Sequence, residues 1–284
     1  MNSMRIAVVT DSTAYLTPEE RERYNIHMIP LSVTLEDGVF EEEVEITTTE
    51  FYDKVRGAKV FPKTTQPSVG KYTELLEELS KDYDEVISIH LSSGISGTYQ
   101  GAVQAADMVE GIKVHTFDSE ISCAPQGIYA KTASELASNG ATVEEIFAKL
   151  ENLKTKMKAY FVVDDLAHLQ RGGRLSSAAA IVGGLLQIKP VLHFENKVIV
   201  PFEKIRTKKK ALKRVEELLG EDAVKYKRLE GVVIHANCEA EGKEWMNELA
   251  DRYPNVSFSL SYFGPVIGTH LGEGSLGLAW VSKN

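Results

Sequence analysis

Between Leu91 and Gly101 the chain reads LSSGISGTYQG, a segment that joins a strand to a helix. The β-rich run Val86–Leu91 leads into it, and a helical pattern starts near Gly97. A further β-rich run, Lys113–Phe117, follows that helix. This order predicts a βαβ unit, and therefore a parallel sheet with helices packed against it.

The turn itself is rich in hydroxyl groups and glycines. Ser92, Ser93, Ser96 and Thr98 each bring a hydroxyl to the place where the helix begins. A strand-to-helix turn also directs backbone N–H groups and the positive end of the helix dipole at whatever lies in front of it. The segment is therefore typical of a site that binds an anion.

Composition limits the function. The 284 residues are 43% hydrophobic and carry a formal net charge of −9, which argues against general nucleic-acid binding. No run approaches the roughly 20 apolar residues of a membrane span. A strand starts at Arg5 and leaves no room for a signal peptide, so we expect a cytoplasmic protein. Cys123 and Cys238 lie far apart and outside any metal-binding spacing, and we expect free thiols and no metal.

The first half of the chain alternates short strands with helices. We expect one strand over 27–35, a helix over 49–56 capped by Thr48 or Thr49, and a turn over 63–68 whose Ser68 caps the next helix. Together with the βαβ unit, these elements predict an N-terminal α/β domain, residues 1–160, with a mostly parallel sheet.

The second half changes character. The runs 189–194 and 197–202, joined by Glu195 and Asn196, predict a β-hairpin. Ser176 begins an alanine-rich helix that ends at Gly184. Later strands alternate with helices, and we expect a C-terminal α/β domain, residues 161–284, with a mixed or antiparallel sheet.

A serine-dependent lipid hydrolase or acyltransferase is one alternative. Ser96 lies in Gly94-Ile95-Ser96-Gly97-Thr98, which departs from the G-x-S-x-G nucleophile elbow at its last residue. His270 and Asp11 would complete a triad, although nothing in the sequence places them in line. A helix cap without function is the other alternative, but four hydroxyls and three glycines exceed what a cap requires.

Two nucleotide-binding motifs are excluded. A P-loop needs a lysine after its last glycine, and none follows Gly97. Residues 272–277 match G-x-G-x-x-G, but residues 278–281 continue as a strand rather than a helix. We expect these glycines to shape a turn beside a ligand.

Further candidates lie elsewhere in the chain. Thr64 and Thr65 add hydroxyls at a helix entry, and His270 lies between two glycines that suggest close backbone approach. A basic stripe, 206–210, is either a solvated helix face or a docking surface for an acidic partner. Arg171 and Arg174 would extend such a surface.

Taken together, these segments resemble the DegV family of bacterial fatty-acid-binding proteins. Thr65 stands where the family usually has serine, and both residues carry a hydroxyl. The matching segments follow one another along essentially the whole chain: VVTDSTAYL at 8–16, KTTQPS at 63–68, LSSGISGTYQ at 91–100, RGGRLS at 171–176, IKPVLHFENKVI at 188–199, RTKKKA at 206–211 and FGPVIGTHLGEGSLGL at 263–278.

The resemblance implies two α/β domains with one long-chain fatty acid buried between them. It implies that Thr64, Ser96 and His270 hold the carboxylate, and backbone N–H groups near Gly97 and the Thr65 hydroxyl lie beside them. It also implies a carrier with no catalysis and no cofactor of its own, neither bound to nucleic acid nor stably inserted in a membrane.

A partner is implied as well. Members of the family present the bound acid to a fatty acid kinase, which makes an acyl phosphate for phospholipid synthesis. Arg206 matches the arginine associated with kinase docking, and Arg174 is our candidate for the same surface.

We expect the helix over 175–186 to form part of the wall around the tail. A regulatory protein whose lipid is only a structural filler is a further alternative.

Overall fold

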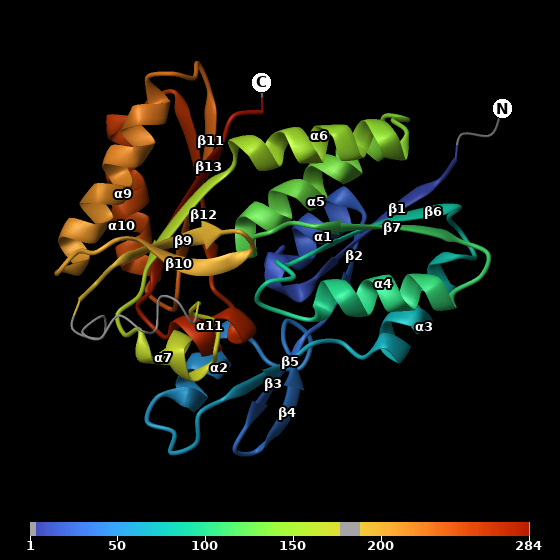
Figure 1. The fold of residues 1–284 in the computed structure, drawn as a ribbon, viewed down its shortest axis with the longest axis horizontal. Coiled ribbons are helices and arrows are strands. Elements are labelled where there is room, and N and C mark those ends of the chain that lie inside the picture. The colour runs from blue at the N-terminus through green and yellow to red at the C-terminus, as the bar shows by residue number, and fades with distance from the viewer. Residues whose placement is uncertain (1–3, 177–187, 284) are drawn as a thin grey trace.

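A four-stranded parallel sheet forms the core of the N-terminal half of the computed structural model, which describes residues 4–176 and 188–283 (Figure 1). Its strand order is β2-β1-β6-β7, and every neighbouring pair is parallel. The strands are β1 (Ile6–Asp11), β2 (Ile26–Ile29), β6 (Glu85–His90) and β7 (Lys113–Asp118). The predicted βαβ unit is confirmed, because α4 (Thr98–Met108) connects β6 to β7.

Helices cover both faces of this sheet. Val9 packs with α3 (Val69–Leu79) and α4, whereas its neighbour Val8 packs with α5 (Cys123–Ser138) and α6 (Val143–Lys156). Side chains alternate across a strand, so both faces of β1 are buried. β1 and β6 are buried along almost their whole length, as strands of a parallel sheet covered on both sides are. A short helix, α1 (Pro18–Tyr24), leads into β2.

The C-terminal half contains a six-stranded mixed sheet of order β10-β9-β8-β13-β11-β12. Only the β11–β12 pair is parallel, so the predicted mixed sheet is confirmed. Two helices, α9 (Lys208–Ala223) and α10 (Glu239–Arg252), pack on one face around Trp245 and Trp280. The strands are β8 (Lys158–Val162), β9 (Val191–Glu195), β10 (Val198–Glu203), β11 (Leu229–His235), β12 (Val256–Tyr262) and β13 (Leu276–Val281).

The predicted hairpin forms from β9 and β10, with one correction to its turn. The turn residues are Asn196 and Lys197, at φ 49° and 72°, whereas Glu195 still belongs to β9. Two successive residues with positive φ are the geometry of the tight turns that match the twist of antiparallel strands. Asn196 is a residue type that adopts this conformation readily, so the turn lies at 196–197, one position later than expected.

A small antiparallel sheet in the first half was not expected. It has the order β4-β3-β5, with β3 (Ser32–Leu35), β4 (Gly38–Glu41) and β5 (Lys63–Thr65). The prediction of one strand over 27–35 is wrong, because β2 ends before Pro30, which has no N–H for a ladder. The prediction of a turn over 63–68 is wrong for its first three residues, which pair with Ser32–Thr34.

The predicted cap of α2 (Thr48–Val55) is also wrong. Thr47 caps this helix: its hydroxyl accepts the N–H of Glu50, and the Glu50 carboxylate accepts the N–H of Thr47. Of the three threonines, only Thr47 has a glutamate three residues later, which is the requirement for a capping box. Ser68 caps α3 as expected, since it accepts the N–H of Lys71.

Two short helices frame the loops near the centre of the molecule. These are α7 (Ala167–Arg171) and α11 (Pro265–Leu271), and the sequence did not predict the second. The exclusion of a dinucleotide motif at 272–277 is confirmed, because β13 follows as a strand. The alanine-rich helix expected from Ser176 to Gly184, and with it nearly all of the expected tail wall over 175–186, lies outside the described residues.

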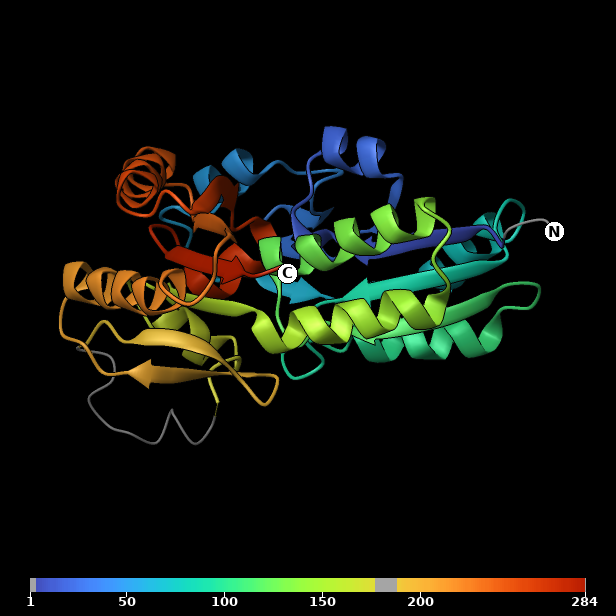
Figure 2. The ribbon, with the colours of Figure 1, turned by 90° about the horizontal axis from the view of Figure 1, so that it is seen from above.

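The two halves share one core. Leu31, Phe51 and Leu91 from the first half pack in the same apolar cluster as Phe161 and Phe263 from the second. Viewed from above, the parallel sheet and the mixed sheet lie end to end along the molecule (Figure 2). Strand β8 crosses residue 160 and lies wholly in the second sheet. The division into domains 1–160 and 161–284 stays a prediction.

Candidate ligand-binding site

An apolar cavity of about 260 Å³ lies between the two halves. Leu31, Leu91 and Ile121 line it from the first half, and Phe161 and Phe263 from the second. A polar set lines the same cavity: Thr64, Thr65, Gln66, Ser96, Gly97, Arg174 and His270. All five residues expected to bind a carboxylate therefore line one cavity, together with one of the two arginines expected to dock a partner.

Thr64 and His270 meet although 206 residues separate them. The Thr64 Oγ1 lies 2.9 Å from the His270 Nε2. Thr64 comes from β5, where it pairs with Val33, and His270 comes from the last turn of α11. The two elements that the sequence did not predict are thus the ones that bring this pair together.

His270 is held neutral by its surroundings. The side chain is 9% exposed, and burial lowers its pKa to about 4, with Arg174 and His168 contributing in the same direction. The ring Nδ1 is buried and has no hydrogen-bond partner in the described part of the chain. At neutral pH the ring is therefore an uncharged group with one donor and one acceptor nitrogen.

Glu42 and Tyr15 anchor the helix that carries His270, and the sequence analysis missed both. The first N–H groups of a helix have no partner within it. A carboxyl oxygen of Glu42 accepts the N–H of Val266 at 2.8 Å, and the Tyr15 hydroxyl accepts the N–H of Ile267 at 3.1 Å. Both anchors come from the first half of the chain and are fully or almost fully buried. No local motif indicates these contacts, although Tyr15 lies in the family segment 8–16, because the partners lie more than 220 residues away.

The start of α4 forms the second polar wall. The Ser96 hydroxyl accepts the N–H of Thr98 at 3.2 Å and lies 2.9 Å from the Thr98 hydroxyl. Gly97 closely contacts Gln66, because a Cβ at Gly97 would lie 2.1 Å from the Gln66 Oε1. The close contact joins the Thr64–Gln66 segment to the turn at Ser96, and a larger residue at position 97 would displace the Gln66 side chain.

Ser92 and Ser93 support the turn. The Ser92 hydroxyl donates to the carbonyl of Lys197 at 2.7 Å, and the Ser93 hydroxyl donates to the Asp118 carboxylate at 2.6 Å. The Lys197 ammonium also lies 3.0 Å from Asp118. The turn of the β9–β10 hairpin is thus bound to the hydroxyl-rich segment of the other half.

The two arginines occupy different environments. Arg174 is half-buried, and its guanidinium donates to the carbonyls of Ile95 at 3.1 Å and Gly172 at 2.6 Å. Arg206 is exposed and makes no hydrogen bond or ion pair with any described residue. Nearby Lys208 and Arg214 form ion pairs with Glu241 and Glu203. Arg174 therefore lies at the cavity, and Arg206 lies on the surface.

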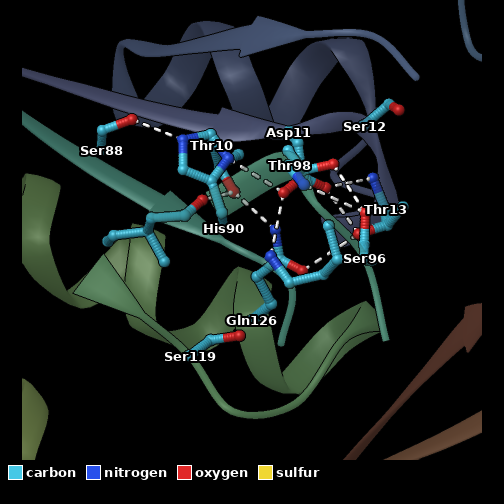
Figure 3. A network of polar contacts seen from close by, with 12 residues as sticks. Thr10, Asp11, Ser12, Thr13, Ser88, His90, Ser96, Thr98, Ser119 and Gln126 are labelled. Carbon is cyan, nitrogen blue, oxygen red and sulfur yellow. Dashed lines mark hydrogen bonds and ion pairs between the residues drawn. The ribbon is translucent and has the colours of Figure 1, made fainter. Parts of the chain in front are cut away.

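The triad of Ser96, His270 and Asp11 does not assemble. Asp11 is buried, and its carboxylate accepts hydrogen bonds from Thr13 and from the N–H of Leu91 (Figure 3). The same carboxylate lies 3.1 Å from the Nδ1 of His90, whose Nε2 lies 2.6 Å from the Ser88 hydroxyl. Ser88, His90 and Asp11 thus form a serine–histidine–aspartate chain, but all three are 0% exposed and out of reach of a substrate.

A second groove, the distribution of possible metal ligands, the helix lengths and the two cysteines also bear on what the protein can bind. A larger groove of about 630 Å³ lies beside β12, but it is lined with serines and with both signs of charge. No three His, Cys, Asp or Glu side chains gather into a metal site within residues 4–176 and 188–283. Among these same residues, no helix is long and apolar enough to cross a membrane. Cys123 and Cys238 are free, and burial raises the pKa of the Cys238 thiol to about 11.

A protein family described as "Uncharacterised protein, DegV family" matches this chain over residues 5–283. The chain belongs to the DegV family. Protein DegV of Bacillus subtilis (strain 168) is 57% identical over 281 residues, which cover 99% of this chain and all of that one. The α/β fold of this chain is that of the solved DegV-family structures, two of which are compared with it next.

The crystal structure of DegV from Bacillus subtilis, described as a fatty acid binding protein, superposes with a TM-score of 0.94. It covers 98% of this chain and 99% of its own, at 57% identity. A DegV family protein from Thermus thermophilus, also described by its fatty acid binding, superposes with a TM-score of 0.91 at 33% identity and covers 98% and 100% of the two chains. The predicted family and fold class are confirmed.

Proposed function

We propose that this DegV-family protein binds one long-chain fatty acid, with the tail in the apolar cavity and the carboxylate at Thr64, Ser96 and His270. One observation carries the proposal: an apolar cavity between the halves is also lined by hydroxyl and imidazole groups from Thr64, Ser96 and His270, with Arg174 as the charged member of the polar set. A fatty acid has the matching shape, a long apolar chain with one polar end. The solved relatives described as fatty acid binding support this assignment.

The tail supplies most of the affinity. Each buried methylene contributes about 0.8 kcal/mol, so a dozen contribute roughly 10 kcal/mol before the losses of freedom on binding are subtracted. The carboxylate contributes orientation, because a buried carboxylate without hydrogen bonds would oppose binding by several kcal/mol. Each charge-assisted hydrogen bond from a hydroxyl or ring N–H contributes about 1.5–3 kcal/mol.

The pair of Thr64 and His270 offers the Thr64 hydroxyl hydrogen to an anion in one of its two arrangements. With the ring hydrogen on Nε2, the ring donates to Thr64, and the Thr64 hydroxyl hydrogen is free for the carboxylate. With the ring hydrogen on Nδ1, Thr64 donates to Nε2 instead. Because the ring is neutral, neither arrangement ties the carboxylate into a strong ion pair, and its oxygen stays available as a nucleophile.

The protein then acts as a carrier in the cytoplasm, without catalysis or a cofactor of its own. It presents the acid to a fatty acid kinase that phosphorylates the carboxylate for phospholipid synthesis. Exposed Arg206, with no partner among the described residues, is the residue we assign to kinase docking. Arg174 belongs to the cavity wall by its contacts, so its part in docking would be indirect.

Mass spectrometry of lipid extracted from the purified protein tests the proposal. A long-chain fatty acid should be present at about one per chain, and the delipidated protein should bind added palmitate. Ser96→Ala and His270→Ala should each weaken that binding. Absence of lipid together with no binding of added acids would reject the carrier, whereas labelling of Ser96 by a fluorophosphonate would favour the serine enzyme.

A further inference from the structure

A second cavity adjoins the first at the Thr64–His270 pair. It measures about 450 Å³ and shares Thr64, Arg174 and His270 with the apolar cavity. We call it the basic chamber. Its remaining described lining residues are Phe61, Pro62, Lys63, His168, Arg171, Gly172 and Thr269.

The chamber gathers cations on an acidic protein. Lys63, Arg171 and Arg174 line it, and none of its described lining residues is acidic. None of the three forms an ion pair within the described part of the chain. The Arg171 guanidinium lies over the Phe61 ring, 3.3 Å from its centroid, and its Nε donates to the Ala167 carbonyl at 3.3 Å. These contacts orient the guanidinium and leave its two terminal nitrogens free for an anion.

The wall between the two cavities contains an unsatisfied polar atom. The His270 Nδ1 is buried without a partner among the described residues and lies against Gly172, where a Cβ would come within 2.2 Å of it. Buried polar atoms in native proteins normally have a partner, so an unpaired one on a residue that lines a cavity with three cationic residues points to a ligand that completes the site.

We propose that the basic chamber binds the phosphoryl group of the acyl phosphate formed from the bound acid. This inference rests on the proposed function. In that reaction a carboxylate oxygen bonds to the terminal phosphorus of ATP, the bond from that phosphorus to the ADP oxygen breaks, and ADP leaves with the electron pair. The charge at the head of the lipid changes from −1 to about −2, and the new group needs space beyond the carboxylate.

The two cavities differ in their chemistry, although Arg174 lines both. Uncharged hydroxyls at Thr64 and Ser96 suit a carboxylate, which two or three hydrogen bonds satisfy. A phosphoryl group has three terminal oxygens and is bound best by guanidinium and ammonium groups. Arg171 and Lys63, which carry such groups, line the same chamber as Thr64 and His270.

A stable analogue tests the chamber. In 2-oxoheptadecylphosphonate a methylene replaces the oxygen between the carbonyl and the phosphorus of palmitoyl phosphate. Binding of this phosphonate and of palmitate should be measured by calorimetry for wild type, for the double variant Lys63→Ala/Arg171→Ala and for Lys59→Ala. Lys63 and Arg171 are exposed, so the double variant should fold. Lys59 is an exposed cation four residues from Lys63 that does not line the chamber, and it serves as the matched control.

We expect the double variant to bind the phosphonate about tenfold more weakly and to bind palmitate within about twofold of wild type. The control should bind both ligands as wild type does. An equal change for both ligands, or none, would overturn the inference while leaving fatty-acid binding intact. Slower turnover by the kinase with unchanged phosphonate affinity would also overturn it, because the chamber would then contact the kinase. Failure of wild type to bind palmitate would instead reject the proposed function.

Discussion

A buried, neutral imidazole determines what the polar end of the cavity can hold. His270 lies 2.9 Å from Thr64 through Nε2, and its pKa is lowered to about 4 mainly by burial. An imidazolium there would pair with a carboxylate and reduce its nucleophilicity. The neutral ring instead orients the hydroxyl of Thr64. Removal of this hydroxyl should therefore have the most direct effect on the affinity for a carboxylate.

Thr64→Val should weaken palmitate binding by about tenfold to a hundredfold, because it removes one charge-assisted hydrogen bond and keeps the shape of the side chain. Thr64→Ser keeps the hydroxyl and is the matched control, so it should bind within a few-fold of wild type. Fluorescence displacement or calorimetry measures both. Equal affinities for the valine and serine variants would remove Thr64 from the site.

At the scale of elements, α11 is positioned by residues that sequence patterns do not mark. Its first N–H groups bond to Glu42 and Tyr15 across the boundary between the halves. Burial raises the pKa of Glu42 to about 8, so the folded protein binds a proton there more tightly than the unfolded chain, whose value is near 4.5. The contribution of Glu42 to the free energy of unfolding is therefore fully present below about pH 4.5 and is lost as the pH rises towards 8.

Glu42→Gln should change the pH dependence of stability. Relative to wild type, the variant should become more stable as the pH rises from 5 to 8, by at most about 1.4 kcal/mol for each pH unit. Urea unfolding at several pH values measures this difference. Glu77→Gln, on the exposed face of α3, should show a constant difference, and a constant difference for Glu42→Gln as well would contradict the assignment.

The β9–β10 hairpin is the second element that joins the halves. A Cβ at Gly94 would lie 2.2 Å from the carbonyl oxygen of Lys197, within the contact that Ser92 makes with the same carbonyl. Gly94→Ala should therefore push the hairpin away and lower the free energy of unfolding by about 1–3 kcal/mol. Gly70→Ala, in a helix with no atom within 4 Å of its added Cβ, should be neutral or stabilising. Similar losses for both variants in urea titrations would show that Gly94 is not constrained by the hairpin.

At the scale of the whole molecule, the proposed binding site and the proposed docking residue lie in different places. The polar end of the cavity lies between the halves, whereas Arg206 projects from the exposed loop before α9. An exposed cation at a rim chiefly affects encounter with a charged partner. Changes at Arg206 should therefore leave the interior of the protein, and its lipid, undisturbed.

Arg206→Ala should bind palmitate with wild-type affinity but support slower phosphorylation by a fatty acid kinase, with the largest loss at low salt. Lys227→Ala, an exposed cation on another loop, is the control. Kinase turnover measured with each loaded protein tests this assignment. Equal turnover by the Arg206 variant and wild type would place the docking surface elsewhere.

Much of this architecture is local enough to be read from sequence. The run around Ser96 predicts the βαβ unit because its strand, turn and helix follow one another within the chain. The family motifs point to Thr64, Ser96 and His270 without reference to their contacts. The sequence does not predict the contacts of Glu42 and Tyr15 with α11, or the strand that carries Thr64. Their partners are distant along the chain, and neither composition nor periodicity indicates a long-range pairing.

The junction between the halves bears on how the proposed lipid would leave the cavity. Both halves contribute walls to the cavity, and the hairpin binds one half to the other through Ser92, Asp118 and Lys197. Under the proposed function, exit of a lipid would require movement of these walls, and the lifetime of the loaded state would then be a mechanical property of the junction between the two sheets.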